Sequence, residues 1–122
     1  MIERIKKIAA KNKEQIIAVR RAMHANPELS FEEYETCELV SEFLKSAGIK
    51  HEKGIVKTGV VAIIEGNNPS SKTIALRADL DALPIQETAD VSFKSKNEGK
   101  MHACGHDVHT SSLLGTALIL HE

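Results

Sequence analysis

The sequence predicts a single small domain in which helices and β-strands pack in layers, of the α/β or α+β class. Two amphipathic helical stretches open the chain, two runs rich in β-branched residues follow, and a strongly apolar helix comes last. The length of 122 residues suits one domain, and 42% hydrophobic with 27% charged residues is typical of a globular protein. These observations favour a folded, layered domain over a disordered chain.

The first predicted helix spans residues 3–23. Its apolar residues recur at spacings that place them on one helical face: Ile5, Ile8, Ile16, Val19 and Met23. Pro27 disfavours helical geometry at the residue before it, so we expect the helix to end there.

The second predicted helix begins at a capping box, because Ser30 stands three residues before Glu33. Apolar residues then continue along one face from Phe31 to Ala47. Gly48 stands where a left-handed residue commonly ends a helix, so we expect the helix to stop at this glycine.

The hydrophobic period changes after the second helix. Residues 58–65 and 73–77 are rich in β-branched side chains, and the turn-forming residues 66–72 between them predict a hairpin-like connection. Residues 79–99 are mostly irregular, with a short strand-like piece at 91–93. The last helix, residues 108–120, is apolar almost all round, which is typical of a helix buried between other elements.

Charge and composition exclude several functions. Sixteen basic residues face seventeen acidic ones, and the chain has no Trp, so it lacks the features expected of a nucleic-acid-binding protein. No apolar stretch approaches the roughly 20 residues needed to cross a bilayer. The N-terminus has no signal-peptide pattern, so we expect no membrane association and a cytoplasmic location.

The densest group of chemically active residues lies between positions 101 and 109. It contains five residues that could bind a metal: His102, Cys104, His106, Asp107 and His109. Imidazole and thiolate are ligands that zinc and similar divalent ions prefer, and the intervening glycine allows a tight turn. The cluster predicts a metal site. Its structural alternative is a buried cysteine among solvated histidines, whereas Cys37 is best explained as a packed helix residue.

A second group of polar residues follows the second β-branched run. Asp79 and Asp81 come where this predicted strand leaves the sheet, a position where α/β enzymes often hold functional groups. A carboxylate there could accept a hydrogen bond from a metal-binding histidine and orient it. The alternative is a simple turn, with Arg77 paired to an acid.

A third segment, residues 20–31, contains His24 and Glu28. A helix stop followed by a capped helix start explains both residues, so we assign neither a catalytic role.

The three segments together resemble one group of enzymes. RRAMHANPELSFEE, LRADLDALPIQE and GKMHACGHDVHTSSLLGTA occur in this order. The chain is thus similar to the metal-dependent N-acyl-L-amino-acid amidohydrolases, which include hippurate and auxin-conjugate hydrolases and form a branch of the aminoacylase and carboxypeptidase-like metallopeptidases. The resemblance implies an α/β fold, the N-terminal portion of a three-layer α/β/α zinc-exopeptidase-like catalytic domain.

The resemblance also implies roles for individual residues. Cys104 and His106 match the metal ligands of the family, with the cysteine able to bridge two ions. Asp81 matches the acid that orients a ligating histidine, and Asp79 stands where related peptidases have a metal-binding histidine. His102 and His109 fit the motif, but we assign neither as a ligand. The implied cofactors are two divalent ions per complete site, of manganese, zinc, cobalt or nickel.

The implied reaction is metal-assisted hydrolysis of the amide bond of an N-acyl amino acid or small peptide. The glutamate that serves as general base in the family belongs to a Glu-Glu pair beyond the CGHD helix. We therefore expect residues 1–122 to represent an N-terminal fragment of the catalytic domain, without its remainder and without the dimerisation domain, and to be inactive alone. We also expect a homo-oligomer. The competing hypothesis is a small non-enzymatic module in which the Cys/His cluster forms a structural zinc site.

Overall fold

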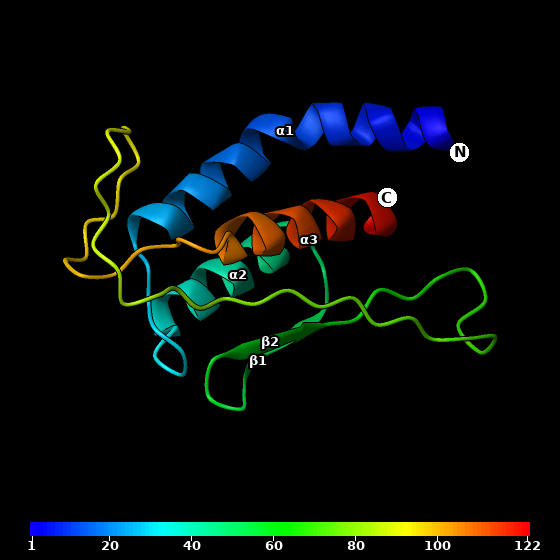
Figure 1. Cartoon of the computed structure of the whole chain (residues 1–122). Helices are drawn as coiled ribbons and strands as arrows, with labels where there is room; N and C mark the ends of the chain where they lie inside the picture. Colours follow the sequence, from blue (N-terminus) through cyan, green and yellow to red (C-terminus); the bar gives the residue numbers. More distant parts are fainter.

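The computed structural model describes all 122 residues, which form three helices and one two-stranded antiparallel sheet (Figure 1). The elements in chain order are α1 (Ile2–Ala25), α2 (Tyr34–Ser46), β1 (His51–Ile55), β2 (Gly59–Ala62) and α3 (His106–His121). No helix combines the length and the apolar character needed to cross a membrane.

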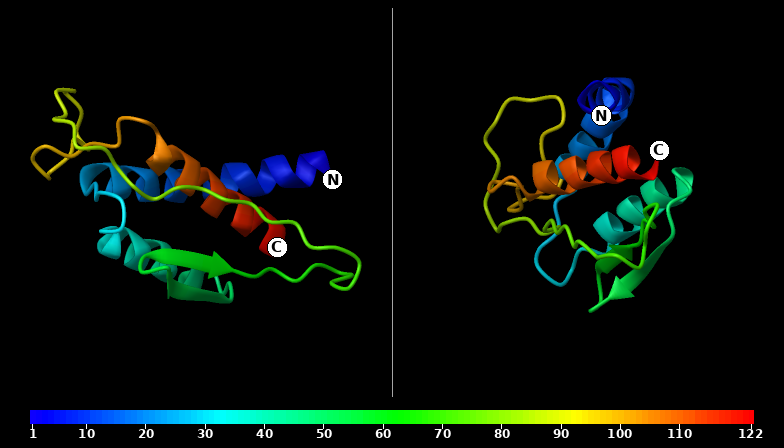
Figure 2. Two further views of the ribbon diagram at one scale, coloured as in Figure 1. Left: turned by 60° about the horizontal axis from the view of Figure 1, so that its bottom comes forward. Right: turned by 90° about the vertical axis from the view of Figure 1, so that its right-hand side faces the viewer.

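The helices and the hairpin are stacked on one another. Helix α1 packs along α3, and α2 packs against both strands of the hairpin. The end-on view in Figure 2 shows α3 between α1 on one side and α2 with the hairpin on the other. A buried apolar cluster joins all three helices and consists of Val19, Val40, Phe43, Leu44, Ile49 and Leu114. This cluster holds α3 against both α1 and α2.

The first helix agrees with its prediction, whereas the second begins later than predicted. Helix α2 starts at Tyr34, and no capping-box hydrogen bond forms between Ser30 and Glu33. Instead, the carboxylate of Glu28 accepts hydrogen bonds from the backbone N–H groups of Glu35 (3.1 Å) and Thr36 (2.8 Å). Glu28 therefore satisfies the free donors of the first turn, which leaves the Ser30 hydroxyl available for a contact elsewhere.

The end of α2 agrees with the prediction from Gly48. This residue has φ of +71°, the left-handed conformation that glycine adopts without steric penalty. The following N–H of Ile49 donates to the carbonyl of Leu44 at 2.9 Å, which closes the C-terminal turn of the helix.

The hairpin differs from the one predicted. Strand β2 pairs with β1, which precedes it, in the register His51↔Ala62 and Lys53↔Val60, with an irregularity between Lys53 and Ile55. The prediction of a hairpin between residues 58–65 and 73–77 is therefore wrong. The sequence of β1, HEKGI, has few β-branched residues, which explains why its pattern did not indicate a strand.

Two other predicted strands are also absent. Residues 73–77 run as an extended segment outside the sheet, with Ile74 76% and Leu76 55% exposed. Residues 92 and 93 lie in a turn. A β-branched run has the right side chains for a sheet, but a strand also needs a neighbour in register, and no segment of this chain pairs with residues 73–77.

Helix α3 is present as predicted, but it is less buried than its apolar sequence suggested. Leu114 is buried, whereas Val108 and Leu120 are 45% and 59% exposed. At the N-terminal end, the buried positions are polar and include Asp107, Thr110 and Ser111. This polar, buried end of α3 is where the candidate site lies.

Candidate functional site

The structure brings Asp81 and His106 into direct contact. Nδ1 of His106, the first residue of α3, lies 3.0 Å from Oδ1 of Asp81 and 3.0 Å from the backbone oxygen of Asp81. Both oxygens are acceptors, so the imidazole donates from Nδ1, and its other nitrogen, Nε2, makes no hydrogen bond. Asp81 thus fixes the orientation of the His106 ring.

Asp81 is itself held by a second contact. The hydroxyl of Ser30 donates to Oδ2 of Asp81 at 2.7 Å, which uses the side chain freed from the capping role. Partial burial alone would raise the pKa of Asp81, but the hydrogen bonds from Ser30, from its own backbone and from His106 outweigh it and lower the pKa below 3.8. Asp81 is therefore ionised at neutral pH and suited to orient an imidazole.

Asp79 lies on the other side of the His106 ring. Its Oδ2 is 3.9 Å from Nε2 of His106, and its Oδ1 pairs with the guanidinium of Arg77. The hydroxyl of Thr110 on α3 donates to the backbone oxygen of Asp79 at 2.7 Å. This hydrogen bond fastens the segment that carries both acids to the first turns of α3. Figure 1 shows this segment of the chain running beside that helix.

Cys104 is exposed and makes no hydrogen bond. Between it and His106, Gly105 has φ of +108°, a conformation that residues with a Cβ rarely adopt. The glycine is also the N-cap of α3, and no side chain caps that end of the helix. The glycine predicted to allow a tight turn between the two candidate ligands therefore does so.

The donor set fits a metal ion in part. Nε2 of His106 and the carboxylate of Asp79 lie close enough to share an ion, and they are the kinds of ligand that divalent metals accept. However, no group of three or more His, Cys, Asp or Glu side chains is arranged to hold a metal ion. A closed structural zinc site needs four such ligands, and these side chains do not present that arrangement.

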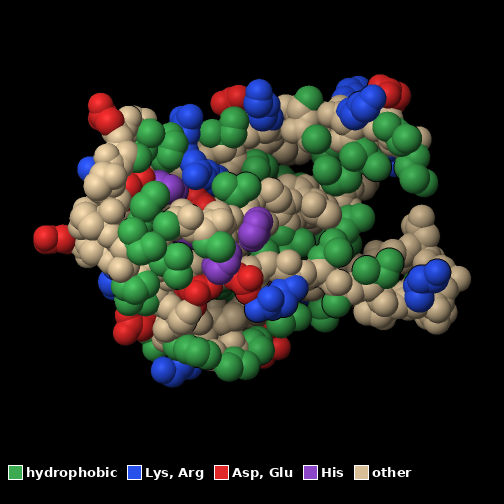
Figure 3. All heavy atoms as spheres, in the orientation of Figure 1, with side chains coloured by type: hydrophobic (Ala, Val, Ile, Leu, Met, Phe, Trp, Pro, Cys, Tyr) green, Lys and Arg blue, Asp and Glu red, His purple; other side chains and the backbone are tan.

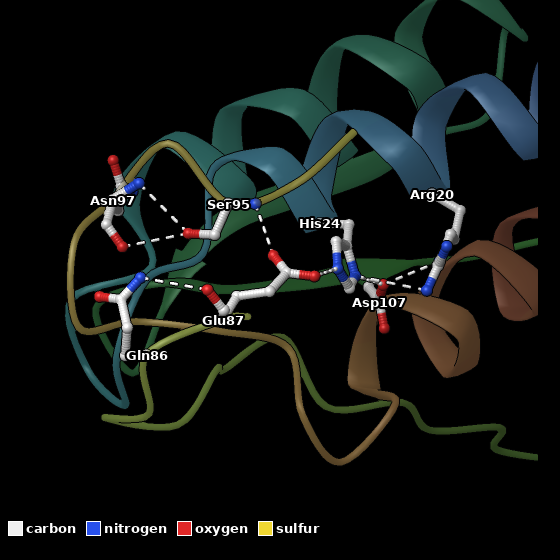
Figure 4. A network of polar contacts seen from close by, with 7 residues as sticks. All are labelled: Arg20, His24, Gln86, Glu87, Ser95, Asn97 and Asp107. Carbon is white, nitrogen blue, oxygen red and sulfur yellow. Dashed lines mark hydrogen bonds and ion pairs between the residues drawn. The ribbon is translucent and has the colours of Figure 1, made fainter. Parts of the chain in front are cut away.

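A network of buried polar residues includes Asp107, the neighbour of His106 in α3 (Figure 4). The carboxylate of Asp107, the second residue of α3, lies 2.8 Å from Nε of Arg20 and 2.8 Å from Nδ1 of His24. Nε2 of His24 lies 3.0 Å from Oε1 of Glu87, whose other oxygen accepts from the backbone N–H of Ser95 at 2.6 Å. We refer to Arg20, His24, Glu87 and Asp107 as the buried network.

Sequence reasoning missed this network. It explained His24 by the helix junction, but the structure places the side chain 5% exposed between two carboxylates. The 83 residues that separate His24 from Asp107 leave no local pattern, and the only available signal was a histidine inside a helix that ends at a proline. Glu28, by contrast, has the helix-capping role that the sequence suggested for this segment.

The two remaining histidines of the cluster differ from each other. His102 is 5% exposed, and neither of its ring nitrogens has a hydrogen-bond partner. Burial lowers the pKa of His102, although the nearby carboxylate of Asp107 acts in the opposite direction. His109 is exposed, with its ring 5.8 Å from that of His106. Figure 3 shows histidine and acidic side chains side by side on this face of the molecule, with apolar side chains around them.

The chain is similar to a known family over its C-terminal part and to individual proteins over nearly its whole length. Residues 75–122, which include all four predicted site residues, match the model of Peptidase family M20/M25/M40. The chain is 52% identical to thermostable carboxypeptidase 2 of Saccharolobus solfataricus over 121 residues, which cover 98% of this chain and 30% of that protein. It is 49% identical to an N-acyl-L-amino acid amidohydrolase of Geobacillus stearothermophilus, covering 98% of this chain and 32% of the relative.

A solved structure shares the fold. The YXEP protein of Bacillus subtilis, described as a dinuclear metal-binding peptidase of the M20 family, superposes with a TM-score of 0.81 at 46% identity and covers 88% of this chain. This likeness confirms the predicted α/β fold class. The chain spans about 30% of the length of each of these relatives.

Proposed function

Because residues 75–122 match the model of Peptidase family M20/M25/M40, we propose that the chain belongs to this family, as its three motifs indicated, and that it carries the N-terminal part of a site for metal-dependent amide hydrolysis. The substrate class we propose is small N-acyl amino acids or peptides. Two kinds of relative support it, because one is named a carboxypeptidase and another an N-acyl-L-amino acid amidohydrolase.

The observation that carries this proposal is the contact between Asp81 and His106. A histidine that ligates a metal commonly donates its second ring nitrogen to a carboxylate, which fixes the ring and strengthens the ligand. Here Nδ1 faces Asp81 at 3.0 Å, so Nε2 is the nitrogen left to bind an ion.

We assign the following roles within the site. Nε2 of His106 and the thiolate of Cys104 are ligands, and the carboxylate of Asp79, 3.9 Å from that nitrogen, is placed to contribute to the same ion. Asp81 orients His106, and Arg77 and Ser30 hold the two acids. The chemistry that divalent cations supply in such a site is activation of a water molecule and polarisation of the amide carbonyl. We propose two ions per complete site, of manganese, zinc, cobalt or nickel.

The hydrolytic reaction also needs a general base, which none of these residues supplies in our assignment. We therefore expect the purified 122-residue chain to hydrolyse neither acetyl- nor benzoyl-amino acids when manganese is added. Release of free amino acid, followed by an amine-reactive reagent, checks this expectation. Metal-dependent turnover that disappears in His106→Ala would show that the chain is catalytically sufficient.

Metal stoichiometry and affinity test the ligand assignment. Elemental analysis and calorimetry would compare the wild type with Cys104→Ala and His106→Ala. His109→Ala is the matched control, because its ring is a near neighbour of His106 but is exposed and has no carboxylate partner. We expect weak binding in the wild type and in His109→Ala, and none in the two ligand variants.

Two results would contradict the proposal. Unchanged affinity in Cys104→Ala and His106→Ala would show that these residues are not ligands. Tight binding of a single ion, lost in both variants, would support the structural zinc module instead, because a closed local site holds its ion without further ligands.

A further inference from the structure

We propose that His24 is a positioning residue, which acts through Asp107 to hold the start of α3 and with it the Cys104–His106 segment. This inference rests on the proposed function, since it takes that segment to be the metal-binding part of the site. His24 itself lies in the last turn of α1 and touches neither of the two proposed ligands.

The ring of His24 joins two parts of the chain that flank Cys104. Nδ1 contacts Asp107, three residues after the cysteine, and Nε2 contacts Glu87, seventeen residues before it. Both partners are almost fully buried, at 1% and 2% exposure, so water does not compete for these hydrogen bonds. The side chain of His24 therefore holds the chain both before and after Cys104.

The Glu87 side of this link belongs to a closed loop. Leu83 and Met101 exchange backbone hydrogen bonds of 2.9 and 3.0 Å at the base of that loop, and Glu87 accepts from Ser95 within it. Phe93 covers the network from the same loop, with its ring edge-on to that of His24 at 5.4 Å and under the guanidinium of Arg20 at 5.1 Å. The loop is thus a stable partner for one nitrogen of His24.

The Asp107 side is where positioning is needed. Gly105 gives the backbone unusual freedom, no side chain caps α3, and the exposed thiol of Cys104 makes no hydrogen bond. The ring of His106 is oriented by Asp81, but the position of its backbone depends on the first turn of α3. The buried carboxylate of Asp107, held by His24 and Arg20, fixes that turn against α1.

Two conservative variants separate positioning from a general contribution to stability. The amide nitrogen of asparagine can take the place of Nδ1 of histidine, and that of glutamine the place of Nε2. His24→Asn therefore keeps a polar contact toward Asp107 and loses the one toward Glu87, whereas His24→Gln does the reverse. Each variant loses one buried hydrogen bond, so their effects on stability should be comparable.

The experiment measures cobalt(II) binding by visible absorption and calorimetry in the wild type and both variants. His51→Gln is the control, because His51 also has both ring nitrogens hydrogen-bonded, to Ser41 and Ile49, but lies in the hairpin. We expect about a tenfold loss of cobalt affinity in His24→Gln, the lower end for residues that support metal ligands. We expect changes within about twofold in His24→Asn and His51→Gln. Equal losses in both His24 variants, no loss in either, or a larger loss in His24→Asn would overturn the proposal.

A second measurement does not depend on metal. Nitrogen-15 and amide proton spectra of the metal-free chain report the His106 ring and the backbone of residues 104–107. We expect these signals to shift in His24→Gln and to stay near their wild-type positions in His24→Asn, and the opposite pattern would overturn the inference. Absence of cobalt binding by the wild type would contradict the proposed function alone, because these spectra still test the positioning role.

A variant that does not fold must be distinguished from one that is mispositioned. Far-ultraviolet circular dichroism identifies a variant that does not fold. If His24→Gln does not fold, Asp107→Asn takes its place in the experiment, because asparagine keeps the shape of the aspartate side chain and removes the charge that Arg20 and His24 face. A folded Asp107→Asn chain with wild-type cobalt affinity would show that this path does not position the site.

Discussion

Asp81 contacts residues from two other parts of the chain, Ser30 before α2 and His106 at the start of α3. We expect Asp81→Asn to lower metal affinity about 10- to 100-fold, because a neutral amide holds the imidazole less firmly than a carboxylate does. The fold should persist, since the Asp81 side chain is only partly buried. Calorimetry with manganese or cobalt checks this, with the exposed Asp90→Asn as control. Wild-type affinity in Asp81→Asn would show that the contact does not support a ligand.

Glu87 gives the fold a specific dependence on pH. Burial alone would raise its pKa, but hydrogen bonds from the Ser95 backbone and from His24 outweigh burial and lower the pKa below the usual 4.5. A carboxyl group with a lowered pKa in the folded state stabilises the fold fully above its unfolded pKa, about 4.5. This stabilisation is lost as the pH falls below that value and through the folded pKa.

Glu87→Gln isolates this contribution. We expect the variant to be less stable than the wild type at pH 7 and the difference in unfolding free energy to shrink as the pH falls below about 4.5. Urea denaturation at several pH values measures the difference, with the exposed Glu98→Gln as control. A difference that stayed constant down to pH 3 would contradict the assigned direction.

At the scale of single residues, the sequence indicated those site residues that lie close together in the chain and missed those whose partners lie far away in it. Cys104, His106, Asp79 and Asp81 could be singled out because they lie in two short motifs. The contact between Asp81 and His106 was expected in kind, because a carboxylate at the end of the predicted strand could orient a metal-binding histidine, and the family resemblance assigned that role to Asp81. His24 could not be predicted, because its partners come from distant parts of the chain and its local surroundings are those of an ordinary helix end.

Gly105 controls the element that carries the proposed ligands. An added Cβ meets no atom within 4 Å, so the only penalty for alanine is the backbone conformation at φ +108°. We expect Gly105→Ala to lower the unfolding free energy by about 1–3 kcal/mol, the usual penalty for such strain. The matched control is Gly66→Ala, which has equal space and no positive φ. Equal stability of the two variants in urea denaturation would contradict this account.

Among the secondary-structure elements, the helices were predictable and the sheet was not. The apolar period of residues 3–23 and the glycine at position 48 indicate helices and their ends, because a helix is stabilised by contacts within a few residues. The start of α2 was misplaced because Glu28, six residues before it, supplies the capping acceptors. The strand pairing was wrong because residues 73–77 have suitable side chains without a partner, whereas β1 pairs despite a polar sequence.

Across the whole molecule, hydrogen bonding and burial are unevenly distributed. The three helices enclose the apolar core, whereas residues 66–78 run outside any helix or strand and are mostly exposed. We expect backbone amides near Val40, Leu44 and Leu114 to exchange slowest with solvent and those of residues 72–78 to exchange fastest. Hydrogen exchange followed by mass spectrometry at several protein concentrations checks this gradient. Strong protection of residues 72–78 at low concentration would contradict it, and protection that rises with concentration would indicate pairing between copies.

The unequal burial of the two cysteines also makes the chain sensitive to oxidants. Cys37 is 5% exposed within α2, whereas the thiol of Cys104 is open to solvent. A peroxide or an alkylating reagent therefore meets Cys104 first, and oxidation beyond the sulfenic acid is not readily reversed. The thiol that we assign to the metal is thus also the most vulnerable atom of the site, and a bound ion would shield it. Oxidants would then modify the sulfur of Cys104, whereas a sufficient supply of metal ions would protect the same sulfur from oxidation.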